Sequence, residues 1–211
     1  MGNKNYTRRE FGYGLSAIGM GVTALVAPHK ASAGLGLESV DANINHIGPK
    51  EGFSPQIGTL ISMLDWVSDS VINYNAKLTV EQLDYLHDAD SNTIGSLMMH
   101  LAATEVIYQD MTLHDLKDFS AANKSKWNAA MELGENARKQ IKGNPLSYYK
   151  DAIDEVRAVT KAEIKKKDDA WLLSGETKEW DWNNYCKWFH VTEHYANHRG
   201  QMTWYAKRMP K

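Results

Sequence analysis

The feature that decides the fold is a repeat of histidines in the stretch His190-Val191-Thr192-Glu193-His194-Tyr195-Ala196-Asn197-His198-Arg199-Gly200-Gln201. Three histidines are spaced four residues apart. Because each helical residue turns the chain by about 100°, positions four apart lie one turn above each other on one face. The stretch therefore predicts a long helix that carries a stripe of imidazoles.

This imidazole stripe has two interpretations. An isolated pair of histidines four residues apart is commonly a solvated or half-buried structural pair. Neutral imidazole is also the commonest protein ligand for Zn, Ni, Cu and Fe, and a rigid helix presents two nitrogens to one ion at low entropic cost. Two histidines do not complete a site, so the metal interpretation requires a donor from another helix.

His100 supplies that donor. It lies in a segment that we expect to be capped by Asp90-Ser91-Asn92, and whose apolar residues recur at helical spacing, namely Ile94, Leu97, Met98, Leu101 and Ala102. Alone, His100 would be a satisfied core histidine; beside the stripe it is the missing ligand. Glu105 and Tyr108 follow one and two turns later, either as groups that support the site or as the polar edge of the helix.

Length, charge and cysteine content narrow the class of protein. The chain has 211 residues and 43% hydrophobic residues, enough for one well-packed domain. Its net charge of −2 argues against a nucleic-acid binder, which is normally strongly basic. Its one cysteine, Cys186, cannot form an internal disulfide, so the fold must rest on its hydrophobic core.

The N-terminus resembles a twin-arginine export signal. Thr7-Arg8-Arg9-Glu10-Phe11 precedes a weakly apolar, glycine-rich run over 12–28, and Ala31-Ser32-Ala33 is a small-residue cleavage signal preceded by Lys30. We expect cleavage after Ala33 and an exported bacterial protein, periplasmic or extracellular. The run is too short and too rich in glycine for a stable membrane span, so we expect none in the mature chain.

Residues 1–33 are the predicted signal peptide. Residues 34–53 lack apolar periodicity and are predicted to be a linker or extended arm, and residues 54–211 are predicted to form the folded domain. Ser54-Pro55 begins a helix that runs to about Asn75. Further predicted elements are a short turn with a capping box at 79–82, a short helix at 127–133, a long helix after Pro145, a loop over 172–182 and the histidine helix at about 183–209. No strand alternation occurs, so we expect an all-α four-helix bundle.

Two segments resemble the signature helices of the DinB-like metalloproteins: residues 92–105, Asn-Thr-Ile-Gly-Ser-Leu-Met-Met-His-Leu-Ala-Ala-Thr-Glu, and the more specific H-x-x-x-H-x-x-x-H-R-G-Q of 190–201. The resemblance covers roughly Ser54 to Met209. It implies a four-helix bundle, often homodimeric, that holds a divalent ion through His100, His194 and His198. It implies a supporting role for His190, which a helix rise of about 11 Å separates from His198.

Three imidazoles leave a divalent ion, such as Zn or Ni, an open position for water or a thiol. Characterised relatives are transferases and isomerases that use low-molecular-weight thiols, so the resemblance implies a small-molecule substrate and a metal-activated thiol. Because such thiols are mainly cytoplasmic, export gives comparable weight to a hydrolase that activates water, and a non-catalytic metal-binding or sensing bundle is the alternative to both. Arg199 is a candidate for holding an anionic group and Gln201 for orienting the nucleophile; the simpler roles are a surface arginine and a packing amide.

Two other metal motifs fit less well. His190 to His194 matches H-x-x-E-H of metallopeptidases, but those enzymes need a distant third ligand and a larger domain. A di-iron bundle needs Glu-x-x-His pairs that are absent here. An aromatic cluster precedes the stripe, formed by Trp180, Trp182, Tyr185, Trp188 and Phe189. We interpret it as core or dimer contact, or as the mouth of the site that sets substrate preference.

Overall fold

The computed structural model describes residues 43–210. The predicted signal peptide and residues 34–42 of the predicted linker lie outside this range. Within the described part of the chain every regular element is a helix. The prediction of an all-α protein is therefore confirmed for residues 43–210.

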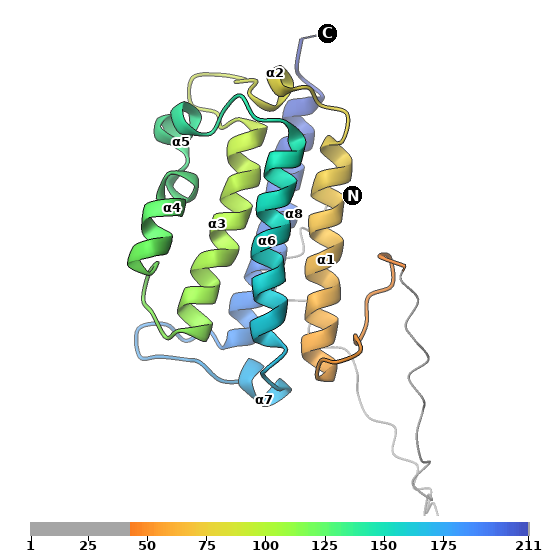
Figure 1. Ribbon diagram of the computed structural model, residues 1–211, viewed down its shortest axis with the longest axis vertical. Helices are drawn as coiled ribbons and strands as arrows, with labels where there is room; N and C mark the ends of the chain where they lie inside the picture. The colour runs from red at the N-terminus through yellow and green to blue at the C-terminus, as the bar shows by residue number, and fades with distance from the viewer. Residues whose placement is uncertain (1–42, 211) are drawn as a thin grey trace, which may run out of the picture. The chain divides into compact units, whose positions relative to one another are not determined.

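Four long helices form the bundle: α1 (Pro55–Asn75), α3 (Ile94–Leu113), α6 (Leu146–Ile164) and α8 (Asn184–Ala206). Helices α1 and α8 run in one direction and α3 and α6 in the other (Figure 1). Helix α3 packs against both α6 and α8, whereas α1 contacts α8 and α6. The seam between the antiparallel helices α3 and α8 therefore brings His100 opposite the histidine stripe.

Short helices connect the long ones: α2 (Val80–Leu83), α4 (Ala121–Glu132), α5 (Gly134–Gln140) and α7 (Asp169–Leu172). Helix α4 packs on α3. The predicted capping box before α2 is confirmed, because Thr79 and Gln82 cap each other reciprocally. The loop predicted over 172–182 begins one residue later, because Leu172 is the last residue of α7.

Two predicted helix starts were wrong, and hydroxyl caps explain both. Helix α3 is capped by Thr93, whose Oγ1 accepts from the Ser96 amide, and not by residues 90–92. Helix α4 begins six residues before the predicted start because the Ser120 hydroxyl accepts from the Asn123 amide. In each case the side chain satisfies a backbone donor that the first helical turn leaves free.

The core lies between the four long helices. Its largest fully buried side chains are Trp188, Tyr149 and Tyr195. A Cβ atom at Gly95 would lie 2.5 Å from the Tyr149 hydroxyl oxygen, so glycine at 95 lets α6 approach α3 closely. No helix among residues 43–210 is long and apolar enough to cross a membrane.

Residues 43–53 lie along α1. The Gly48 amide donates to Ser62 Oγ, and Lys50 Nζ lies 2.7 Å from Asp65 Oδ2. A Cβ atom at Gly58 would lie 2.4 Å from the Lys50 backbone nitrogen, which shows how closely this segment approaches the helix. This part of the predicted linker is thus held by specific contacts with the bundle.

Candidate metal centre

Three histidine nitrogens converge at the seam between α3 and α8. His194 Nε2 lies 2.9 Å from His100 Nε2 and 3.0 Å from His198 Nε2. All three ligand atoms lie within 4.8 Å of one another. The structure therefore brings together the three residues that the sequence predicted as ligands.

A backbone carbonyl fixes the tautomer of His100. Its Nδ1 lies 3.0 Å from the Ala130 carbonyl oxygen, which can only accept, so Nδ1 carries the proton and Nε2 presents a lone pair. This carbonyl is free because α4 ends two residues later. The chain leaves the helix at Leu133 and Gly134, both with positive φ, and the last carbonyls of a helix have no intrahelical partner.

The side-chain amide of Gln201 fixes the tautomer of His198. Its Nδ1 lies 2.8 Å from Gln201 Oε1, so Nδ1 donates and Nε2 is left as an acceptor. His194 can point one proton at only one of its two neighbours. The lone pair of His100 or that of His198 is therefore left without a donor, an arrangement that a shared cation stabilises.

Burial keeps these imidazoles neutral. Desolvation, followed by the charge of His198, lowers the pKa of His100 to about 4. Desolvation and the neighbouring histidines lower the pKa of His194 to about 3, and desolvation lowers the pKa of His198. At neutral pH all three are therefore unprotonated, as metal ligation requires.

The donor set fits a divalent transition metal. Zinc lies about 2.0–2.1 Å from imidazole nitrogens, which in a tetrahedral site places neighbouring nitrogens about 3.3 Å apart. The observed separations of 2.9 and 3.0 Å need to widen by only a few tenths of an ångström. His100 and His198 are 8% and 9% exposed, whereas His194 is half-buried. The site is thus accessible from the side of His194.

His190 lies one turn from His194, with ring centroids 5.4 Å apart. Its Nδ1 contacts Glu193 Oε2, and its ring packs against Tyr108 and Trp182 at 5.9 and 5.6 Å between centroids. It is absent from the group of converging nitrogens. His190 therefore borders the triad within an aromatic cluster.

A model of the mycothiol S-transferase family matches residues 59–204, more than half of the chain and including all three histidines. The chain belongs to the mycothiol S-transferase family. That family is DinB-like and metal-dependent, as the signature helices predicted.

The fold has a solved counterpart. A conserved protein from Enterococcus faecalis superposes with a TM-score of 0.55 and 17% sequence identity, covering 70% of this chain and 93% of that one. At this identity the likeness concerns the fold alone. No curated protein matches the chain significantly.

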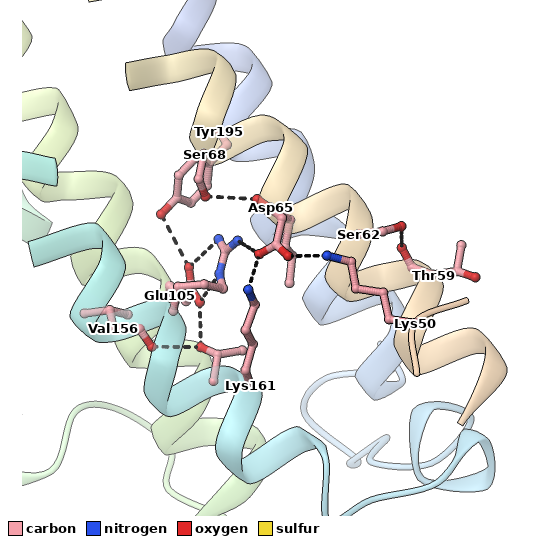
Figure 2. Close-up of polar contacts among 12 residues, drawn as sticks. Lys50, Thr59, Ser62, Asp65, Ser68, Glu105, Val156, Lys161 and Tyr195 are labelled. Carbon is pink, nitrogen blue, oxygen red and sulfur yellow. Dashed lines mark hydrogen bonds and ion pairs between the residues drawn. The ribbon is translucent and has the colours of Figure 1, made fainter. Parts of the chain in front are cut away.

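In this member of the mycothiol S-transferase family, Glu105 makes its hydrogen bonds with residues outside the triad. Its carboxylate receives two hydrogen bonds from Arg157, both 2.8 Å long, and a third from Thr160 (Figure 2). The Tyr195 hydroxyl lies 3.4 Å away. None of the hydrogen bonds found among residues 43–210 joins Glu105 to a triad histidine. Glu105 thus ties α3 to α6 and α8 inside the core.

Arg199 faces α1. Its Nη1 donates to Ser70 Oγ at 2.9 Å, and its guanidinium carbon lies 5.2 Å from the Trp66 ring centroid and 5.6 Å from that of Tyr74. A cation held between two aromatic rings anchors α8 to α1. Of the three residues predicted to assist the metal, the structure brings only Gln201 to the triad.

A cavity of about 470 Å³ lies beside Gln201, and its lining includes Asp88, Ser91, Asn197 and Trp204. These side chains offer hydrogen-bond donors and acceptors next to an aromatic ring. Sequence reasoning missed this cavity and the Ala130 carbonyl. The only sequence signal for the free carbonyl was the predicted end of a helix near Gly134, because the last carbonyls of a helix lack partners. Asp88 and Ser91 of the cavity lie in a loop, where no apolar periodicity identifies them.

Proposed function

We propose that this protein is a metal-dependent thiol S-transferase that joins a low-molecular-weight thiol to an electrophilic acceptor. The observation that carries the proposal is the convergence of three neutral imidazole nitrogens, two of which are fixed as acceptors by Ala130 and Gln201. His100, His194 and His198 would hold one divalent ion, with Zn or Ni suited to such a donor set.

An ion held there supplies a positive charge that lowers the pKa of a thiol or water in its open position. The protein's own residues orient that chemistry. The Ala130 carbonyl and Gln201 hold two rings in place, and half-buried His194 faces the entrance. In the cavity beside Gln201, Asp88, Ser91 and Asn197 offer hydrogen bonds to the thiol's polar groups.

The proposed reaction is a substitution in which the thiol sulfur displaces a leaving group from carbon. The thiol sulfur forms a bond to the acceptor carbon, the bond from that carbon to its leaving group breaks with its electron pair, and the thiol proton is released with the leaving group. The family match supports the thiol, since the matching family is named for transfer of mycothiol.

The test uses full-length protein loaded with Zn or Ni, a thiol and 1-chloro-2,4-dinitrobenzene. Thioether and chloride should form in equal amounts, and the rate should fall to that of the uncatalysed reaction in metal-free protein and in His194→Ala. Hydrolysis of activated esters without added thiol would instead identify a hydrolase. Tight metal binding without either reaction would identify a non-catalytic binding protein.

We also propose that the chain is exported after cleavage at Ala33, on the strength of Arg8-Arg9 and Ala31-Ser32-Ala33. Mass spectrometry of the protein from the exported fraction should give an N-terminus at Gly34. An Arg8→Lys/Arg9→Lys variant should stay in the cytoplasm. An exported, uncleaved chain would contradict the cleavage site, and export of the double variant would contradict the signal type.

A further inference from the structure

Four aromatic rings form a continuous surface at the His190 end of the triad. We call Tyr108, Trp180, Trp182 and His190 the aromatic wall. Trp182 packs on His190 and Trp180, with ring centroids 5.6 and 5.2 Å apart, and Tyr108 contacts Trp180 at 6.2 Å. His190 in turn lies 5.4 Å from His194. The wall therefore continues directly from the most accessible ligand of the triad.

Three of the four rings are partly exposed, whereas Tyr108 is 7% exposed and belongs to the hydrophobic core. Trp180, Trp182 and His190 are half-buried, so they present ring surface to solvent, whereas Trp188 on the same helix as His190 is fully buried. The loop before α8 that carries two of them is fixed: the Thr177 amide donates to the Trp180 carbonyl, and Lys187 Nζ donates to the Gly175 carbonyl at 2.6 Å. The wall is thus preorganised rather than assembled by a ligand.

The Tyr108 hydroxyl is a polar group within this wall. None of the hydrogen bonds found among residues 43–210 uses it. Burial raises the pKa of Tyr108 to about 12, with a further contribution from Cys186, so the hydroxyl stays protonated at neutral pH. It remains a hydrogen-bond donor for an incoming ligand.

Charge narrows the ligand class. Lys187 Nζ lies 5.3 Å from the Trp180 ring centroid, the position that a cationic ligand would take. A second cation there would be repelled, and the Glu193 carboxylate that contacts His190 would repel an anion. A neutral, electron-poor ring would instead stack on the electron-rich indoles. The aromatic wall and the cavity beside Gln201 lie at opposite ends of the α8 stretch from His190 to Gln201, with the triad between them along the helix.

We propose that the aromatic wall is the acceptor subsite and that it binds a flat, uncharged conjugated electrophile carrying a hydrogen-bond acceptor for Tyr108. The assignment to an acceptor rests on the proposed transferase function. Trp182 is then a specificity-determining residue, because its ring lies between Trp180 and His190.

The test measures binding of 1,3-dinitrobenzene, an electron-poor ring without a leaving group, to the full-length protein by calorimetry. Trp182→Leu should weaken binding about 3- to 10-fold, the range expected for loss of one aromatic contact. Trp182→Phe should restore it. Tyr108→Phe, which keeps the ring and removes the donor, should weaken binding about threefold. Trp171→Leu is the matched control, since Trp171 is another half-buried indole with a lysine, Lys167, over its ring.

Unchanged binding in Trp182→Leu, or equal losses in Trp182→Leu and Trp171→Leu, would overturn the inference. The result is separable from the proposed function, because the probe cannot react. Probe binding that depends on Trp182, in a protein that transfers no thiol, would contradict the transferase proposal alone. Thiol transfer with an unchanged KM for the electrophile in Trp182→Leu would contradict the acceptor subsite alone.

Discussion

Gln201 Oε1 lies 2.8 Å from His198 Nδ1, one helical turn along α8, and so determines which nitrogen of His198 faces the triad. Its side chain is exposed, so it contributes little to the core. At the triad its role is to orient one imidazole.

Gln201→Leu should therefore lower metal affinity about 10-fold, the usual minimum for loss of a group that orients a ligand. Competition with a chromophoric chelator measures the affinity, and circular dichroism should show unchanged helicity. Gln140→Leu is the matched control, because its amide contacts only Asn136 on the surface. Equal affinities for Gln201→Leu and the native protein would show that His198 needs no such support.

The ion pair between Glu105 and Arg157 predicts a stability effect. Both side chains are buried, at 0% and 6% exposure. Glu105→Gln should cost up to about 3–5 kcal/mol in the free energy of unfolding, because it removes the carboxylate that receives two hydrogen bonds from the buried Arg157 and leaves its charge to the more distant Asp65, at 3.5 Å. Urea unfolding measures this, and Glu105→Leu/Arg157→Met should be more stable than the single variant.

The comparison for that pair is Lys139→Ala, which breaks the exposed contact between Lys139 and Glu135. It should leave the unfolding midpoint unchanged, since exposed pairs contribute little. A Glu105→Gln protein as stable as Lys139→Ala would mean that Asp65 alone compensates the charge of Arg157.

Asp65 predicts the response of stability to acid. Burial raises its pKa, but hydrogen bonds and charges from Lys161 and Lys50 outweigh burial, so the pKa lies below the ordinary value of 3.8 (Figure 2). The folded state therefore binds fewer protons than the unfolded state near this pH. The stabilisation is complete above pH 3.8 and is lost as pH falls through the lowered pKa.

Urea unfolding of metal-free protein at several pH values checks this expectation. Asp65→Asn should be less stable than the native protein at pH 6, and the difference should shrink as the pH falls below 3.8. Asp118→Asn, which alters an exposed ion pair with Lys124, should show a far smaller difference at pH 6. A difference for Asp65→Asn that grows toward low pH would contradict the assigned direction.

The long helices and the triad could be predicted because both depend on local periodicity. Histidines spaced four apart share a face wherever the helix packs, and the apolar spacing around His100 identifies a second buried helix. The same argument explains Arg199. One residue beyond His198, it is rotated by about 100° and faces α1 instead of the triad.

Contacts between distant segments could not be predicted in this way. Arg157, the partner of Glu105, lies 52 residues further along the chain, and Ala130 contributes a backbone atom that has no sequence signature. The start of α4 was missed because residues 121–126 have weak apolar periodicity. The Ser120 hydroxyl nevertheless caps the helix there by accepting from the Asn123 amide. Which buried polar groups pair with each other depends on how the helices pack. Local sequence patterns do not reveal that packing.

Elemental analysis of the purified native protein, beside His194→Ala and His100→Ala, tests the central claim most directly. We expect about one equivalent of a single transition metal per chain in the native protein, little in either variant, and unchanged helicity in all three. His114→Ala, an exposed histidine at the end of α3, should keep its metal. A native protein without metal, or a His194→Ala protein that retains a full equivalent, would contradict the metal centre.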